Sequence, residues 1–290
     1  MRSFEYILDT SLDSFNLVHI FECGQCFRWE KQEDESYIGI IKDTVLRVKV
    51  IEDKVNVKGV TLIDDIEEYL KFYFDLNTDY NKYKTKLLNK DEYLKRSVEF
   101  GYGIRILNQD LWETIISFII SANNNIPRIK KIINAISKEY GNKIVFEDKE
   151  YYTFPSVENL AKASVEDLRK LGLGFRDKRV YNTTHMILEN KIDLNNLKSL
   201  DSTFKMKEEL LKLDGVGEKV ADCILLFALQ RRDAFPVDVW VRRVMNDLYI
   251  HSDNEEKLDK KMIRNIAEEK FEDIAGIAQQ YLFYWRREVG

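Results

Sequence analysis

The stretch Leu213-Asp-Gly-Val-Gly-Glu-Lys-Val-Ala-Asp-Cys223 decides the fold, because it places a Gly-x-Gly turn between two amphipathic segments. Glycine lets the backbone bend tightly, and the N–H groups that begin the next helix then point outward, where they suit a phosphate. Lys219 falls in the first turn of that helix, where the positive end of the dipole favours a neutral, nucleophilic amine. The alternative is an ordinary connection between helices, which short turns of this kind also form.

A second segment, Phe-Pro-Val-Asp-Val at residues 235–239, supplies a carboxylate about twenty residues after Lys219. Asp238 precedes an amphipathic stretch and is expected to cap its N-terminus. Together the two segments resemble the helix-hairpin-helix superfamily of DNA glycosylases, whose motif joins Leu-x-Gly-Val-Gly and a Lys to a later Pro-Val-Asp. The matching positions are Leu213, Gly215, Val216, Gly217, Lys219, Pro236, Val237 and Asp238.

Four further segments resemble one branch of that superfamily, the 8-oxoguanine DNA glycosylase/AP lyases, and extend the resemblance over nearly the whole chain. They are Gly-Gln-Cys-Phe-Arg-Trp at 24–29, Asn-Asn-Asn-Ile-Pro-Arg at 123–128, Leu-Gly-Leu-Gly-Phe-Arg at 171–176, and Ala-Gly-Ile-Ala-Gln at 275–279, which is followed by Phe283.

Hydrophobic periodicity divides the chain into two parts. Residues 1–95 alternate at period two, most clearly over 37–41, 46–50 and 54–60, and then show one helix-like stretch over 64–74. From about residue 96 the period is 3.6 and stays there. It predicts helices over 109–121, 126–140, 164–171, 176–190, 203–213, 218–229, 238–248, 255–270 and 274–287.

We therefore predict an α+β fold. An N-terminal antiparallel β-sheet domain with a flanking helix, residues 1–95, packs on a mostly helical glycosylase domain, residues 96–290, with the helix-hairpin-helix at about 203–230. Boundary signals agree, because Pro127 suits a first helical turn, Ser164 with Asp167 forms a capping box, and Gly172 follows a helix end.

Composition bounds the class of protein. The 290 residues are 44% hydrophobic, and no apolar run approaches the roughly 20 residues of a membrane span. We expect a monomer in the cytoplasm, associated with the nucleoid. The three cysteines are too few for a disulfide scaffold and favour a reducing compartment.

The cysteines also bear on cofactors. Cys23 and Cys26 form one C-x-x-C, which alternatively suggests a metal site, but no second Cys or His pair has ligand spacing. No cysteine follows Cys223, so the C-terminal four-cysteine iron–sulfur motif of several relatives in the superfamily is not expected. We predict no metal and no cofactor, apart from the nonessential cation that the family often binds at the hairpin.

The net charge of −5 is unusual for a DNA-binding protein, because phosphate neutralisation supplies much of the affinity. Its distribution matters more. Residues 169–179 contain five basic residues and one aspartate, a local net charge of +4, although such runs are often only a solvated face.

The resemblance implies roles for particular residues around the reacting sugar and the extruded base. Lys219 is the expected nucleophile, and Asp238 the carboxylate that stabilises positive charge as the glycosidic bond breaks. Cys223 and Phe227 share a helix face with Lys219, although such residues are more often core. In the family the base pocket is formed by the residues at the positions of Gly24, Cys223, Phe227, Gln279 and Phe283.

A further set of residues is implied to act on the opposite strand. Arg128 and Arg176 match the family arginines that donate to the orphan cytosine, Asn123 matches the residue that fills the vacated space, and Phe175 matches the wedge. The alternative is that both arginines contact only phosphate. Trp240 departs from the family, which often has His at that position and uses it for a phosphate or sugar contact.

The sequence thus predicts a bifunctional glycosylase and AP lyase that removes 8-oxoguanine, preferably opposite cytosine, from double-stranded DNA. One alternative is an enzyme of the endonuclease III kind that acts on other oxidised bases. The second is a damaged-DNA-binding module that keeps the hairpin fold without catalysis.

Overall fold

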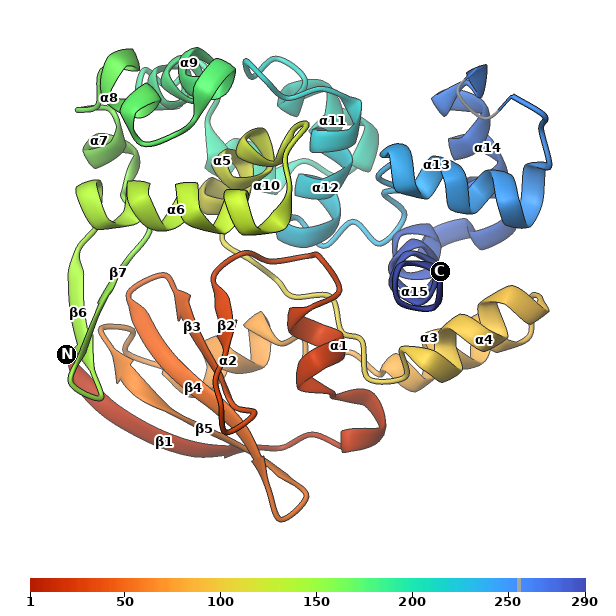
Figure 1. The fold of residues 1–290 in the computed structure, drawn as a ribbon, viewed down its shortest axis with the longest axis horizontal. Helices are drawn as coiled ribbons and strands as arrows, with labels where there is room; N and C mark the ends of the chain where they lie inside the picture. The colour runs from red at the N-terminus through yellow and green to blue at the C-terminus, as the bar shows by residue number, and fades with distance from the viewer. Residues whose placement is uncertain (255–256) are drawn as a thin grey trace.

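The computed structural model describes residues 1–254 and 257–290, and it shows an antiparallel sheet beside a larger group of helices (Figure 1). The sheet has the strand order β1-β5-β4-β3-β2, and every neighbouring pair is antiparallel. Its strands are β1 (Arg2–Leu8), β2 (Trp29–Lys31), β3 (Tyr37–Ile41), β4 (Thr44–Ile51) and β5 (Lys54–Thr61). The α+β prediction is therefore confirmed.

The three strands with the clearest alternation, β3, β4 and β5, form as predicted. On β5, Val55 and Val57 are fully buried, whereas Lys54 and Lys58, on either side of this pair, are exposed. This alternation places one face of the strand in the core and the other in solvent. The sequence did not single out β1 and β2. Strand β1 pairs with β5, more than forty residues away, so its partner is not a local signal.

Two helices cover the buried face of the sheet, α1 (Leu17–Phe21) and α2 (Ile66–Tyr73). The Phe21 ring stacks on Trp29 of β2, with 4.0 Å between ring centres. Asn16 caps α1 by accepting hydrogen bonds from two backbone N–H groups of its first turn. This packing fixes the loop after α1, which carries Gly24.

The rest of the chain is mainly helical, and α4 packs against the C-terminal helix α15 (Figure 1). No helix in the described ranges is long and apolar enough to cross a membrane. The longer helices are α3 (Tyr80–Leu88), α4 (Glu92–Phe100), α5 (Leu111–Ser121), α6 (Ile126–Tyr140), α9 (Asp177–Leu188), α11 (Thr203–Leu210), α12 (Glu218–Ala228), α14 (Lys260–Phe271) and α15 (Ala275–Val289). The shorter ones are α7 (Val157–Leu160), α8 (Val165–Lys170), α10 (Leu194–Ser199) and α13 (Val239–Met245), which continues into a π-helical turn (Asn246–Ile250).

The body after residue 96 is mostly helical as predicted, but the helical period does not hold at one place. Strands β6 (Lys143–Phe146) and β7 (Lys149–Tyr152) form a hairpin that extends from α6 toward the sheet (Figure 1). Ile144 and Phe146 pack against Ile38 and Val45 of the sheet, and this burial stabilises the hairpin. The turn residues, Glu147 and Asp148, both have positive φ, but they lack the Asn-Gly signature of such a turn.

The helices that were predicted lie close to observed ones, whereas α1, α3, α4, α7 and α10 were not predicted. Helix α6 has the predicted bounds, with Pro127 in its first turn. Ser164 and Asp167 form the capping box of α8, and Gly172 follows its end. The helix predicted over 255–270 includes two residues outside the described ranges, and α14 begins at Lys260.

Candidate active site

The turn between α11 and α12 is as tight as its glycines predict. Gly215 has φ +85°, and a Cβ there would lie 3.0 Å from Cβ of Arg179 on α9, so any other residue would be strained and crowded. Gly217 caps α12 without a side-chain hydrogen bond, and a Cβ built on it would meet nothing within 4 Å. The start of α12 therefore has uncapped N–H groups beside open space, an arrangement that suits a phosphate.

Helix α9 supports this turn from behind. The Thr183 hydroxyl donates to the Asp214 carbonyl at 2.7 Å, and the Asn182 amide donates to the Asp214 carboxylate at 2.6 Å. The hairpin is thereby fixed to the segment that follows the predicted basic run.

Lys219 and Asp238 lie near the same buried thiol. Lys219 is half-buried, and its Nζ is 5.1 Å from the centre of the Phe118 ring. One helical turn along α12, burial raises the pKa of Cys223 to about 11; the charge of Lys219 opposes this rise and the charge of Asp238 adds to it. Such effects require proximity. The structure thus places the two expected catalytic residues where the charge of each acts on Cys223, a residue expected to flank the base.

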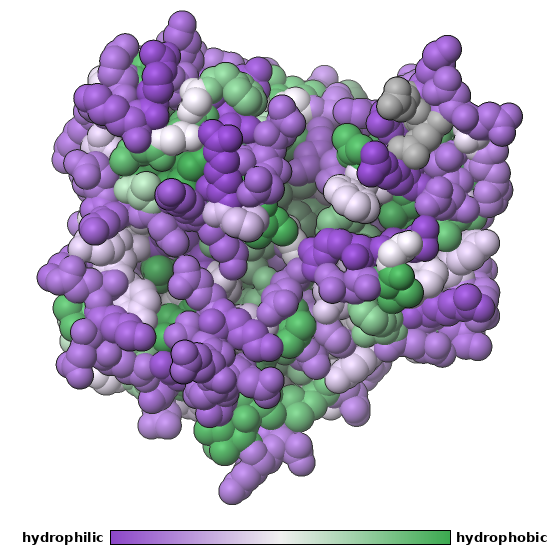
Figure 2. Space-filling model, viewed as in Figure 1, coloured by the Kyte–Doolittle hydropathy of each residue, from purple (hydrophilic) through white to green (hydrophobic). Residues whose placement is uncertain are grey.

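Asp238 has the predicted local role. It is the N-cap of α13, and its carboxylate accepts a hydrogen bond from the Val241 N–H at 2.8 Å. Figure 2 shows this face of the molecule hollowed near its centre, between α12 and α13, with hydrophilic residues around the rim.

The other charged residues of α12 belong to a group of ion pairs that the sequence did not reveal. Lys207 binds Glu218 at 2.8 Å and Asp222 at 2.7 Å, and Arg264 binds the same two carboxylates at 3.2 and 3.1 Å. The partners lie on α11 and α14, so no spacing within one helix could have predicted them. These contacts fix α12 between its neighbours.

Aromatic packing connects α12 to α5. The Phe227 ring stacks on Phe118, with centres 5.5 Å apart and planes 18° apart, and Phe118 is the ring near Lys219. Phe118 was not predicted as a site residue, because a buried phenylalanine in an apolar helix gives the same signal as any core residue.

The remaining predicted pocket residues come from the N-terminal loop and from α15. Gly24 has φ +88°, and a Cβ built there would lie 3.4 Å from Cε1 of Phe283 and 3.5 Å from a guanidinium nitrogen of Arg287. Gln279, one turn before Phe283, is buried, and its Oε1 has no hydrogen-bond partner. A buried acceptor without a partner is costly unless a ligand satisfies it.

The predicted orphan-base residues lie together around the loop between α5 and α6. Asn123 is exposed and has φ +51°, and Phe175 is 57% exposed. Arg128 is exposed, with one nitrogen 3.4 Å from the Gly172 carbonyl.

Arg176 differs from Arg128, because it is only 2% exposed. Its guanidinium donates to the carbonyls of Ala122 at 2.6 and 2.8 Å and of Asn123 at 2.7 Å, and lies 4.2 Å from the centre of the Phe175 ring. Burial lowers its pKa, and the nearby charges of Arg128 and Arg179 lower it further. In this structure, Arg176 supports the loop rather than presenting free donors.

The two remaining sequence features lie at the surface and in the core. Trp240 is 52% exposed beside Asp238, and the Arg243 guanidinium is 5.4 Å from its ring centre. Cys23 and Cys26 are both buried as free thiols. No group of three or more His, Cys, Asp or Glu side chains in residues 1–254 and 257–290 is arranged to hold a metal.

Comparisons with known proteins agree with this geometry. Residues 7–115 match the family described as 8-oxoguanine DNA glycosylase, N-terminal domain, and residues 116–277 match the HhH-GPD superfamily of base excision DNA repair proteins. The chain belongs to the 8-oxoguanine DNA glycosylase family. The N-glycosylase/DNA lyase of Saccharomyces cerevisiae is 33% identical over 269 residues, which cover 83% of this chain and 70% of the yeast protein.

Two solved structures support the family assignment. The 8-oxoguanine glycosylase/lyase of Clostridium acetobutylicum in its apo form has a TM-score of 0.90 and 44% identity, covering 97% of this chain and 96% of that one. The same enzyme in complex with double-stranded DNA containing cytosine opposite 8-oxoguanine has a TM-score of 0.90 and 42% identity, covering 99% of this chain and 98% of that one.

Proposed function

We propose that this chain is a bifunctional DNA glycosylase and AP lyase that excises 8-oxoguanine from double-stranded DNA, preferably opposite cytosine. The observation that carries the proposal is that Lys219 and Asp238 both lie near Cys223. Lys219 is in the first turn of α12, whose uncapped N-terminal N–H groups suit a phosphate. The family assignment supports it, because the similar Clostridium acetobutylicum protein is an 8-oxoguanine glycosylase/lyase.

The proposed chemistry begins when the damaged nucleotide leaves the base stack, since its sugar is inaccessible inside a duplex. The neutral amine of Lys219 attacks the anomeric carbon, the glycosidic bond breaks, and the base departs with the bonding electron pair. The Asp238 carboxylate stabilises the positive charge that develops on the sugar. The attached amine loses a proton, the C1′–O4′ bond of the sugar breaks, and O4′ takes up a proton, which leaves a Schiff base between Lys219 and C1′. The Schiff base acidifies the C2′–H. Loss of that proton expels the 3′ phosphate by β-elimination and breaks the strand on the 3′ side.

The pocket chemistry distinguishes oxidised guanine from guanine. Only 8-oxoguanine carries a hydrogen on N7, and the Gly24 carbonyl is the proposed acceptor for it. The Oε1 of Gln279, buried without a partner, would accept from the pairing edge of the purine. Cys223 and Phe283 would contact the two faces of the base.

On the opposite strand, Arg128 is the proposed reader of cytosine, because its exposed guanidinium donors match the acceptors of cytosine. Arg176 is the second proposed reader, and it would need to release a carbonyl of the 122–123 loop to reach the base. Asn123 would fill the gap left by the flipped nucleotide, and Phe175 would wedge into the stack.

The two alternatives make different predictions. An enzyme of the endonuclease III kind shares the lysine and aspartate but has no reason to combine Gly24, Gln279 and Phe283 in one pocket. A non-catalytic binding module has no need for an amine beside a carboxylate.

We also propose that the reaction needs no cofactor, so a chelator should not change the excision rate. The enzyme is further proposed to work as a monomer on nucleoid DNA in the cytoplasm.

Borohydride trapping tests the function directly. The wild-type protein should be captured covalently on a duplex with 8-oxoguanine opposite cytosine, and Lys219→Gln should still bind that duplex without capture, base release or nicking. Lys191→Gln is the matched control, because Lys191 is an exposed lysine paired with Glu189. Capture on oxidised pyrimidines but not on 8-oxoguanine would refute the substrate, and excision by Lys219→Gln would refute the nucleophile.

A further inference from the structure

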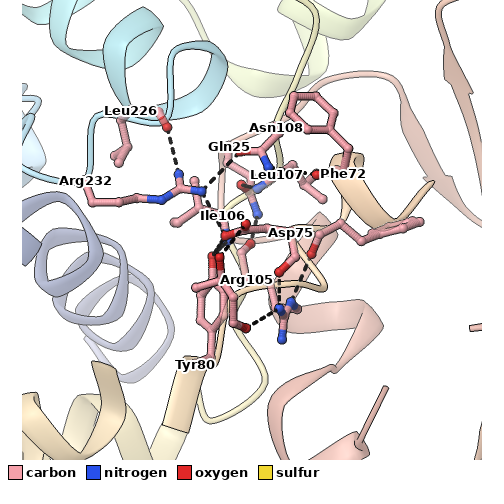
Figure 3. A network of polar contacts seen from close by, with 12 residues as sticks. Gln25, Phe72, Asp75, Tyr80, Arg105, Ile106, Leu107, Asn108, Leu226 and Arg232 are labelled. Atoms are coloured by element: carbon pink, nitrogen blue, oxygen red, sulfur yellow. Dashed lines mark hydrogen bonds and ion pairs between the residues drawn. The ribbon is translucent and has the colours of Figure 1, made fainter. Parts of the chain in front are cut away.

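Arg232, in the loop after α12, connects the helical body to the N-terminal part of the chain (Figure 3). One guanidinium nitrogen donates to the Leu226 carbonyl near the end of α12, at 3.1 Å. The other donates to the Asp75 carboxylate at 2.9 Å and to the Asn108 side-chain oxygen at 3.1 Å. The Arg232 and Asp75 side chains are only 11% and 12% exposed, so little water screens the pair.

The same residue also reaches the helix that carries Gln279 and Phe283. The main-chain carbonyl of Arg232 accepts a hydrogen bond from the Gly276 N–H at 2.8 Å, in the first turn of α15. Arg232 therefore contacts α12, which carries Lys219, and α15, which carries two proposed pocket residues.

The N-terminal end of this network leads to the Gly24 loop. The Gln25 side chain accepts from the Leu107 N–H at 2.8 Å and donates to the Arg105 carbonyl at 2.7 Å, and it is fully buried. The adjoining residue Asn108 is the one that Arg232 binds (Figure 3). The segment 105–108 is thus held at once by the neighbour of Gly24 and by Arg232.

Asp75 is itself held rigidly. Its Oδ1 accepts from the Thr78 hydroxyl at 2.7 Å, and its Oδ2 accepts from the Tyr80 hydroxyl at 2.9 Å as well as from Arg232. Because Tyr80 is buried and Thr78 and Arg232 are partly buried, the Asp75 carboxylate is held at a defined position as well as being attracted to Arg232.

We propose that Arg232 is a positioning residue for base recognition. It holds α12 and α15 against the N-terminal part, so that the Gly24 carbonyl, Phe283 and Lys219 converge on one extruded base. The inference deepens the proposed function and rests on it. It implies that loss of Arg232 impairs the step that needs the base to be gripped, whereas cleavage at an abasic site, which has no base, depends mainly on α12.

The test compares two reactions of the full-length protein under single-turnover conditions. These are excision of 8-oxoguanine opposite cytosine and strand cleavage at a preformed abasic site. Arg232→Met should slow excision about tenfold, because misplaced reacting groups lose rate steeply, and slow abasic-site cleavage less than about threefold. Arg232→Lys, which keeps the charge, should recover part of the excision rate.

Arg231→Met is the matched control, since Arg231 binds the Leu200 carbonyl at 3.0 Å and the Met206 sulfur at 3.2 Å within the helical body. It should leave the ratio of the two rates unchanged. An equal loss of both reactions in Arg232→Met would assign Arg232 to general stability and overturn the proposal, as would no loss of either.

Amide hydrogen exchange separates this proposal from the function on which it rests. Arg232→Met should increase exchange both in residues 22–28 and in residues 276–283, and unchanged exchange in either segment would overturn the positioning role whatever the substrate. Failure of the wild-type protein to excise 8-oxoguanine would instead overturn the proposed function.

Discussion

Glu113 is a buried carboxyl whose environment makes the stability of the fold depend on pH. It lies in the first turn of α5, with a side chain 17% exposed. Burial raises its pKa to about 7, the charge of Arg28 at 3.6 Å opposes this rise, and the charge of Asp110 adds to it. The Arg28 guanidinium does not interact with Glu113 alone, since it also donates hydrogen bonds to the Ser137 hydroxyl at 2.6 Å and to the Tyr152 carbonyl.

The sign follows from proton binding. The folded state holds a proton on Glu113 more tightly than the unfolded state, so this contribution to stability is complete below about pH 4.5 and is lost as the pH rises through about 7. A rise from the ordinary value of 4.5 to about 7 corresponds to about 3 kcal/mol, since one pKa unit is worth about 1.4 kcal/mol. Glu113→Gln replaces the protonated carboxyl by a neutral group of the same shape.

We therefore expect Glu113→Gln to be about as stable as the wild type in acid and more stable in base. Between about pH 5 and about pH 8.5, its advantage in free energy of unfolding should grow by roughly 2.5 kcal/mol. Urea unfolding at both pH values measures this, with Glu92→Gln, an exposed first-turn glutamate of α4, as the control. An equal advantage at both pH values, or a Glu113→Gln protein less stable than the wild type at about pH 8.5, would refute a buried carboxyl with a raised pKa at this position.

Three further predictions concern the site. In Gly24→Ala, the added methyl group has room beside Phe283, but the backbone φ of +88° at residue 24 costs an L-residue roughly 1–2 kcal/mol. Excision of 8-oxoguanine should therefore fall while cleavage at an abasic site persists. Equal losses in the two rate assays would contradict this. Asp238→Asn keeps a good N-cap, so thermal unfolding should change little while single-turnover excision falls about a hundredfold or more; retained activity would remove the carboxylate from the chemistry. Arg128→Ala should relax the preference for cytosine by about 1–3 kcal/mol, measured as excision rates opposite all four bases, whereas Lys178→Ala should not. Equal wild-type excision rates opposite every base would contradict the proposal that Arg128 reads cytosine.

The parts of the fold that the sequence predicted are those with local causes. The turn at Gly215, the cap at Asp238 and the capping box at Ser164 each depend on residues within four positions of one another. Hydrophobic periodicity gave the bounds of α6 for the same reason. Such signals need no knowledge of the tertiary structure.

The parts that were missed depend on distant partners. Strands β6 and β7 are short, and they form a hairpin because Ile144 and Phe146 pack against sheet residues about one hundred positions earlier in the chain. Phe118 becomes a site residue only because α5 and α12 pack together, and Arg232 matters only because Asp75 faces it. Before the fold is known, nothing separates these residues from ordinary core or surface positions.

The arrangement of charges bears on the proposed binding of a DNA phosphate at this hairpin by an acidic chain. Glu218 is the first residue of α12, so its carboxylate stands close to the N–H groups that suit a phosphate and would repel that phosphate if it were unopposed. Lys207 at 2.8 Å and Arg264 at 3.2 Å oppose its charge, and the same two cations bind the buried Asp222. The two carboxylates on this side of α12 are thus balanced by two cations, while Lys219 lies on the neighbouring face with Cys223. The net charge of −5 therefore says little about the potential that a DNA backbone meets at this helix end, which is set by the dipole and by locally balanced ion pairs.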